Sequence, residues 1–208
     1  MITILASSDD ALIIDKPAGL PLDPGRRGGP SLADLLPALR RGRFMPAPAH
    51  RLDQDTAGCL ALARSKAALR DLSARFAARD VQKLYWAVLR GDLAGDAGVV
   101  DAPLLKHSTR EDGWHMRVDP AGAAAITEWR ALGRAPGLTW VEFAPHTGRT
   151  HQLRAHAAHL GHPILGDARY GGGEGAMHLL ARRLVIAGLD ATAPVPAHMR
   201  EAIAACGG

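Results

Sequence analysis

The chain has 208 residues, of which 47% are hydrophobic, so it can bury a core and forms one domain or one domain with two lobes. A net charge of +4, with far more arginine than lysine, suits an anionic partner such as phosphate. Two cysteines exclude a disulfide framework, and no apolar run reaches the roughly 18 residues of a membrane span. We therefore expect a soluble, cytoplasmic protein without a membrane partner.

Short strands and turns open the chain. Residues 2–5 and 11–15 are predicted as strands, and Pro17 with Gly19 ends the second one. Residues 24–30 are rich in glycine, proline and arginine, which predicts a loop.

The most clearly predicted element is a helix that Ser65 caps and that runs to about residue 78. Leu69, Leu72 and Phe76 recur at spacings of three and four, so they share one helix face.

Strands dominate the rest of the chain. Alternation over residues 83–90 predicts a strand with Tyr85 and Trp86 on opposite faces. Further strands are expected at residues 114–118, 124–132, 138–144 and 184–187. Several are joined by glycine or proline turns, which are typical of antiparallel pairing. This pattern favours an α+β fold with a mixed, mainly antiparallel central sheet and peripheral helices.

One more helix is predicted from Arg149 to Leu160, with Leu153 on its apolar face and Gly161 after its end. We find no internal repeat and no linker long enough to divide the chain. Residues 1–208 are thus expected to form a single catalytic-size domain, without a separate RNA-binding module.

The segment His50-Arg51-Leu52-Asp53 has the strongest chemical signal. An aspartate among cations stays ionised when partly buried, because an opposite charge offsets the cost of burial. Arg51 and Arg154 are candidate cations, and a carboxylate held in this way serves as a nucleophile or a base. The plainer alternative is that Asp53 only caps the turn before Thr56.

Tyr85 and Arg154 have structural alternatives as well. A tyrosine ring stacks on bases and its hydroxyl moves protons, but strand tyrosines are more often packing residues. A helical arginine is more often a solvated residue with a packed stem.

Two other patterns favour no special chemistry. The spacings of five, three and three among His151, His156, His159 and His162 do not give the i, i+4 pair of a helical zinc site. Gly171-Gly172-Gly173 lacks the lysine of a phosphate loop and is predicted as a flexible loop.

Several motifs taken together resemble the RluA-type pseudouridine synthases, over nearly the whole chain. The motifs are Lys16-Pro17-Ala18-Gly19, His50-Arg51-Leu52-Asp53, Lys83-Leu84-Tyr85, Gly148-Arg149-Thr150-His151-Gln152-Leu153-Arg154 and His162-Pro163-Ile164-Leu165-Gly166-Asp167. Two departures from the family are an alanine, Ala57, in place of the usual serine and the lack of an amino-terminal S4-like domain.

The resemblance implies a role for each matching residue. Asp53 would be the catalytic aspartate, Tyr85 the tyrosine under the target base, and Arg154 the ion-pair partner of Asp53. Arg51 would open the RNA stack, and the cleft would cross the middle of the sheet. Lys83 and Arg149 are candidates for phosphate contacts.

The implied activity is isomerisation of a flipped-out uridine in transfer or ribosomal RNA, by a monomer that needs no cofactor and no metal. Whether Asp53 attacks as a nucleophile or removes the C2′ proton of the ribose stays open. A non-catalytic RNA-binding protein and, more remotely, a metal-dependent hydrolase on the histidine-rich helix are the alternatives.

Overall fold

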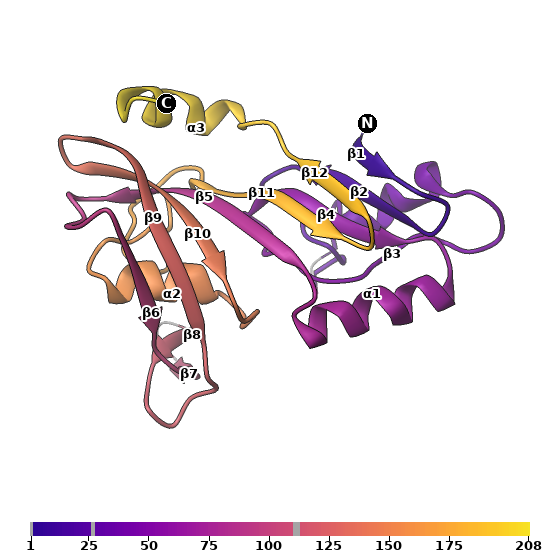
Figure 1. Ribbon diagram of the computed structural model, residues 1–208, viewed down its shortest axis with the longest axis horizontal. Helices are drawn as coiled ribbons and strands as arrows, with labels where there is room; N and C mark the ends of the chain where they lie inside the picture. The colour runs from indigo at the N-terminus through magenta and orange to yellow at the C-terminus, as the bar shows by residue number, and fades with distance from the viewer. Residues whose placement is uncertain (1, 26–27, 110–112) are drawn as a thin grey trace. The chain divides into compact units, whose positions relative to one another are not determined.

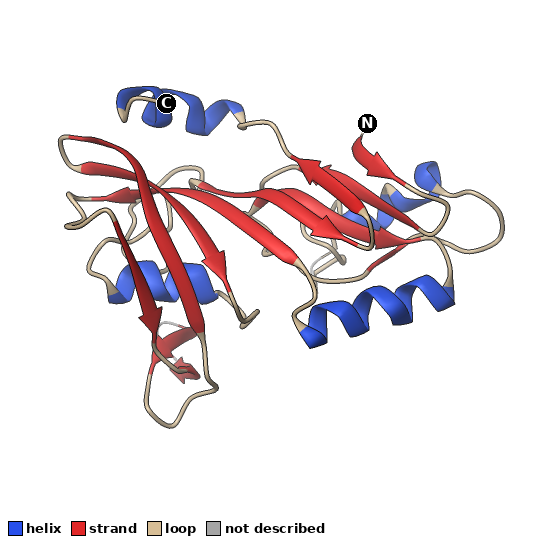
Figure 2. Ribbon diagram, in the orientation of Figure 1, coloured by secondary structure: helices blue, strands red, loops and turns tan. Residues whose placement is uncertain are grey.

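The computed structural model describes residues 2–25, 28–109 and 113–208. The chain divides into two compact units, Met1–Lys83 with Leu180–Val195 (unit 1) and Leu84–Leu179 with Pro196–Gly208 (unit 2). In each unit more residues lie in strands than in helices (Figure 2). Within the units the strands pair antiparallel, except β4 with β11, so the expected α+β class is confirmed. That the whole chain is one domain stays a prediction.

The sheet of unit 1 has the strand order β1-β2-β4-β11, with β12 paired to β11 and β3 paired to β4 (Figure 1). The bounds are β1 Thr3–Ser7, β2 Ala11–Lys16, β3 Ala47–Pro48, β4 Ala57–Ala63, β11 Leu179–Ile186 and β12 Leu189–Thr192. The two opening strands were predicted, whereas β11 begins earlier than its sequence pattern suggested.

β4 lies inside this sheet, and all of its residues are buried. Its sequence, Ala-Gly-Cys-Leu-Ala-Leu-Ala, consists mainly of small residues, which lets both faces pack closely. Gly58 has φ +106°, and a Cβ there would lie 2.3 Å from the carbonyl oxygen of Ala181 on β11. Only glycine fits this approach of two backbones.

The capped helix of unit 1 is α1, Lys66–Ala78. The Ser65 hydroxyl accepts a hydrogen bond from the backbone N–H of Ala68 at 3.0 Å, as predicted for a helix cap. Arg79 ends the helix in the left-handed conformation, at φ 62°. Two short 3₁₀ helices, Leu32–Asp34 and Leu36–Leu39, precede it.

The main sheet of unit 2 has the order β5-β10-β9-β6, and β7 with β8 forms a separate hairpin (Figure 1). The bounds are β5 Gln82–Arg90, β6 Ala97–Asp101, β7 Leu104–Thr109, β8 Gly113–Val118, β9 Ile126–Ala135 and β10 Leu138–Pro145. The pairing of Tyr85 with Phe143 and of Trp86 with Glu142 places the two aromatic residues of β5 on opposite faces, as expected.

Two helices belong to unit 2, α2 at Gln152–His159 and α3 at Ala197–Ala205. α2 begins later than predicted, because His151 takes the left-handed conformation, φ 51°, and residues 149–151 turn before the helix. Its Leu153 and Ala157 join the hydrophobic core with Phe143. α3, which the sequence patterns did not predict, packs near β9 and β10.

Among the described residues, no helix is both long and apolar enough to cross a membrane.

Candidate active site

Asp53 lies in unit 1, in the loop that leads into β4. Its backbone carbonyl accepts a hydrogen bond from Thr56 N–H at 3.1 Å, which closes the turn that the plainer interpretation of the sequence predicted. Leu52 is buried and Asp53 half-buried, whereas Arg51 is exposed. A buried leucine thus fixes the loop, and the charged residues on either side of it face outward to different degrees.

The buried side chain of Lys16 hydrogen-bonds to this loop. The side chain has 0% exposure, and its ammonium donates to the carbonyl oxygens of Pro17 at 2.9 Å, Leu20 at 2.9 Å and Gln54 at 2.8 Å. All three protons of the ammonium are therefore used. The first motif and the aspartate motif are joined through one buried side chain.

The charge of Lys16 also acts on the acids of the loop. Burial lowers the pKa of Lys16 to about 8, and the nearby Asp55 and Asp53 carboxylates oppose that shift. At neutral pH Lys16 still carries its proton. It supplies a positive field to both carboxylates, in addition to any effect of Arg51.

His50 has a structural role in the motif. Its Nε2 accepts a hydrogen bond from Ala61 N–H at 3.0 Å, and its ring stacks on Phe76 of α1 at 4.3 Å. Burial and then the charge of Lys83 lower the pKa of His50 to about 3, so the ring is neutral. His50 thereby ties the loop to β4 and α1.

Two cations gather at the end of α1. Lys83 is half-buried, and its pKa is lowered by burial and by the neighbouring charge of Arg79. Lys83 was predicted as a phosphate contact, whereas Arg79 was missed. The available signal was its position in the sequence, directly after the last helical residue and four residues before Lys83.

Tyr85 lies in unit 2, on the face of β5 that packs against α2. It contacts the core cluster that contains Phe143, Leu153 and Ala87, and its side chain is half-buried. The packing role expected of a strand tyrosine is therefore present, and the half-buried ring still leaves part of its surface accessible.

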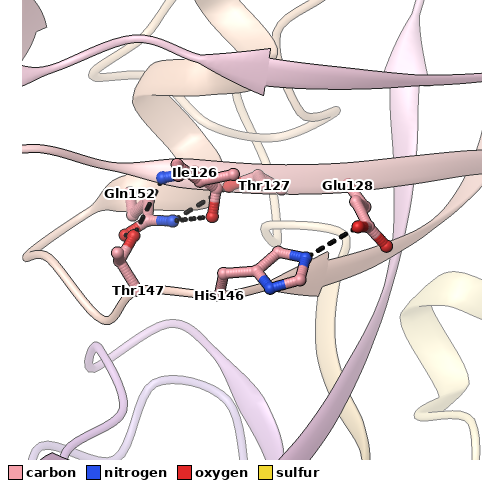
Figure 3. A network of polar contacts seen from close by, with 6 residues as sticks. All are labelled: Ile126, Thr127, Glu128, His146, Thr147 and Gln152. Carbon is pink, nitrogen blue, oxygen red and sulfur yellow. Dashed lines mark hydrogen bonds and ion pairs between the residues drawn. The ribbon is translucent and has the colours of Figure 1, made fainter. Parts of the chain in front are cut away.

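The start of α2 is fixed by the Gln152 amide, which makes four hydrogen bonds. Its oxygen accepts from the Thr147 hydroxyl at 2.7 Å and from Arg149 N–H at 3.0 Å. Its nitrogen donates to Ile126 O at 3.0 Å and to the Thr127 hydroxyl at 2.9 Å, both at the start of β9 (Figure 3). The amide has no unused capacity, so it locks the loop before α2 onto the sheet.

Arg154 projects from the helix that Gln152 anchors. Its Nε and Nη2 donate to the two carboxylate oxygens of Asp167 at 2.7 and 2.8 Å, and the side chains are 8% and 0% exposed. This buried bidentate pair fixes the plane of the guanidinium. Tyr170 supports it from one side, since the guanidinium carbon lies 5.1 Å from the centre of the tyrosine ring.

Asp167 was quoted as part of a motif but not predicted as a site residue. The turn that carries it is tight, because Gly172 N–H donates to Asp167 O at 2.8 Å and a Cβ on Gly172 would lie 1.7 Å from Ile164 O. The three glycines lie in a loop, as expected, but Gly172 is buried and closes the turn around Asp167.

Arg149 is exposed, and its Nε donates to Ala124 O at 3.1 Å. The histidines that follow have separate partners. His156 contacts the Thr127 hydroxyl at 2.9 Å and Ala102 O at 3.0 Å, and His162 contacts Arg90 O at 2.9 Å. Within residues 2–25, 28–109 and 113–208, no group of three potential metal ligands is found.

The predicted site residues thus fall into two sets. Arg51, Asp53 and Lys83 lie in unit 1, and Tyr85, Arg149 and Arg154 lie in unit 2. The ion pair of Asp53 with Arg154 stays a prediction.

Comparisons with known proteins agree with this fold. The sequence profile of the RNA pseudouridylate synthase family matches residues 10–159. The chain is 45% identical over 204 residues to an uncharacterised RNA pseudouridine synthase of Zymomonas mobilis, with 93% of each chain covered. Among solved structures, human RNA Pseudouridylate Synthase Domain Containing 4 has a TM-score of 0.83 and 26% identity, with 98% of this chain and 92% of that one covered.

The ribosomal large subunit pseudouridine synthase C of Vibrio vulnificus is 38% identical over 169 residues, which cover 81% of this chain. Those residues are 52% of that protein, so the match spans about half the length of this relative. The fold and these similarities define an isomerase that acts on RNA. The chain belongs to the RNA pseudouridylate synthase family and, within it, to the RluA type.

Proposed function

We propose that this protein converts uridines of ribosomal or transfer RNA to pseudouridine, with Asp53 as the catalytic carboxylate. The observation that carries the proposal is the loop of Asp53, a half-buried carboxylate beside Gln54, whose carbonyl oxygen accepts a hydrogen bond from the fully buried Lys16. The name of the Vibrio relative favours ribosomal RNA of the large subunit as the first substrate to test.

The reaction is an isomerisation and needs no other reactant. The bond from N1 of uracil to C1′ of the ribose breaks, the base turns, and C5 bonds to C1′. The proton on C5 is lost and N1 gains one, so atoms and electrons balance. The target nucleotide must leave the RNA stack first, at a cost of a few kcal/mol.

Each predicted residue has a part in this scheme. Asp53 acts either as a nucleophile or as the base that removes the C2′ proton, and Lys16 stabilises its negative charge. Tyr85 stacks under the base, and its hydroxyl is available for the C5 proton. Arg154, held by Asp167, pairs with Asp53 in the active enzyme.

The remaining cations act on the RNA itself. Arg51 is exposed beside Asp53 and enters the space that the flipped nucleotide leaves. Lys83 and Arg149 contact phosphates, and Arg79 reinforces the positive charge beside Lys83. The protein acts as a monomer in the cytoplasm, and its own side chains supply all the chemistry.

The test is Asp53→Asn, with Asp55→Asn as the matched control. Asp55 is an exposed acid of the same loop and also lies near Lys16. We expect Asp53→Asn to lose at least about 10³-fold in pseudouridine formation, while RNA binding is kept. Asp55→Asn should stay within about tenfold of the wild type, since it removes only part of the field on Lys16.

Pseudouridine mapping of ribosomal and transfer RNA from a deletion strain, complemented with each variant, measures the outcome. A strain rescued equally well by Asp53→Asn would contradict the catalytic role. Wild-type protein that binds RNA and leaves every uridine unchanged would instead favour a non-catalytic RNA-binding protein.

A further inference from the structure

Four arginines of unit 1 lie in the two chain segments that the pairing of β3 with β4 brings together. Arg40, Arg41 and Arg43 follow the second 3₁₀ helix, and Arg64 directly follows β4. Pairing of Ala47 on β3 with Ala63 on β4 brings the two segments together. We refer to these four residues as the arginine cluster.

Arg40, Arg41 and Arg43 are exposed, and the segment is folded locally, because the Nε of Arg40 donates to Gly42 O at 2.8 Å. Burial lowers the pKa of Arg64, and the positive charge of Arg41 lowers it further. Like charges held side by side repel each other, so the cluster favours a polyanionic partner.

Several arginines elsewhere on the surface form ion pairs with carboxylates. Arg75 pairs with Asp71 at 2.9 Å, Arg130 with Glu142 at 2.8 Å, and Arg183 with Asp190 at 2.5 Å.

In the described part of the chain, no ion pair includes a residue of the arginine cluster. The negative charge of Asp9 partly opposes the lowering of the Arg64 pKa, but Asp9 and Arg64 form no ion pair in the described part of the chain. The Nε of Arg64 is buried and has no acceptor among the described residues. The positive charge of the cluster is thus left for a partner to neutralise.

Arg64 of the arginine cluster is far from the proposed catalytic loop, because the loop of Asp53 precedes β4 and Arg64 follows it. A strand of this length, Ala57–Ala63, spans roughly 20 Å at about 3.3 Å per residue. A nucleotide with its base at Asp53 does not reach Arg64, so any RNA at the cluster belongs to flanking sequence.

We propose that the arginine cluster binds the phosphate backbone of the RNA at a point remote from the target uridine. This inference rests on the proposed function, in which RNA is the substrate. Guanidinium groups match phosphate oxygens in a bidentate manner, and such contacts fix the register of the RNA without reading its sequence. The cluster therefore contributes to RNA affinity and not to the chemical step.

The test is the triple variant Arg40→Gln, Arg41→Gln and Arg43→Gln, studied with transcripts of transfer RNA and of large-subunit ribosomal RNA. We expect RNA affinity at about 0.1 M salt to fall tenfold or more. The slope of log affinity against log salt should fall by about one for each phosphate that the variant no longer binds. On a transcript that the wild type modifies, KM should rise as the affinity falls, while kcat is unchanged.

Two control variants separate this role from overall charge and from folding. Arg130→Gln with Arg134→Gln and Arg183→Gln removes the same number of positive charges from ion-paired sites and should keep wild-type affinity and slope. Arg40→Lys with Arg41→Lys and Arg43→Lys keeps the charge and should recover most of the slope. Thermal melting of each variant checks that it is folded.

Wild-type affinity and salt slope in the folded glutamine variant would overturn the proposal, as would an equal loss of affinity in the ion-paired control. A loss confined to kcat would overturn it as well. Binding to phosphatidylserine vesicles that depends on the cluster, with RNA binding unaffected, would assign the cluster to a membrane instead. If the wild type modifies no uridine but binds RNA through these arginines, the proposed function fails and this inference stands.

Discussion

The two units hold their key charged residues in different ways. In unit 1, Lys16 binds backbone carbonyl groups, so it positions a loop, and the Asp53 carboxylate itself remains half-buried. In unit 2, Asp167 binds the Arg154 guanidinium directly, so it positions the functional group. The first arrangement fixes the main chain around a reactive side chain, whereas the second fixes the side chain.

The largest effect is expected in unit 2, from Asp167→Asn. The change removes the negative charge of the carboxylate that binds the buried Arg154 guanidinium, which costs about 3 to 5 kcal/mol of unfolding free energy. Urea unfolding measures this cost, and pseudouridine formation should fall in parallel.

The control for Asp167 is Asp96→Asn, which breaks the exposed pair with Arg134. That variant should lose less than about 1 kcal/mol of unfolding free energy. If the two variants lose similar stability, the guanidinium is held by the helix and not by the buried carboxylate.

Lys16→Met tests the corresponding element of unit 1. Three carbonyl oxygens lose their donor, so we expect unfolding free energy to fall by about 2 to 4 kcal/mol, partly offset because the charge is no longer buried. Activity should fall further than stability at saturating RNA, since the loop of Asp53 loses its anchor.

Lys66→Met, at an exposed position at the start of α1, is the matched control for Lys16 and should be near neutral. Full activity in Lys16→Met would show that the buried leucine beside Asp53 suffices to hold the loop.

His50 gives the smallest and most selective effect, which is limited to acid. Its folded pKa of about 3 lies below the ordinary value of 6.5, so the unfolded chain binds the extra proton first. The contribution of His50 to stability is complete above pH 6.5 and is lost as the pH falls toward 3. His50→Gln keeps an acceptor for Ala61 N–H but does not titrate.

Melting temperatures across this pH range should fall more steeply for the wild type than for His50→Gln. His159→Gln, at an exposed histidine, should follow the wild type. If the melting temperatures of wild type and His50→Gln fall in parallel with pH, protonation of His50 does not contribute to the loss of stability in acid.

Local signals predicted α1 well and β4 not at all. The helix signal is local: the capping Ser65 and the spacing of Leu69, Leu72 and Phe76 all lie within 12 consecutive residues. β4 has no alternation of polar and apolar residues and no β-branched residues, and it lies buried between β2 and β11, which come from distant parts of the chain. β4 is a strand because of its tertiary packing, and a short stretch of sequence does not show that packing.

The site shows the same limit. Asp53, Tyr85 and Arg154 were predicted as site residues because their motifs resemble those of a family, whereas the pair of Arg154 with Asp167 spans a helix end and a turn. The late start of α2 depends on His151 in a conformation that few residues other than glycine adopt. Neither feature has a signature in residue spacing.

Gly58 sets a limit on how this enzyme can vary. Every other amino acid carries a Cβ, which at this position would lie 2.3 Å from the oxygen of Ala181. A saturation library at position 58 should therefore return glycine alone among active clones. The position lies five residues after Asp53. The loop of Asp53 therefore leads directly into a residue at which no substitution is tolerated.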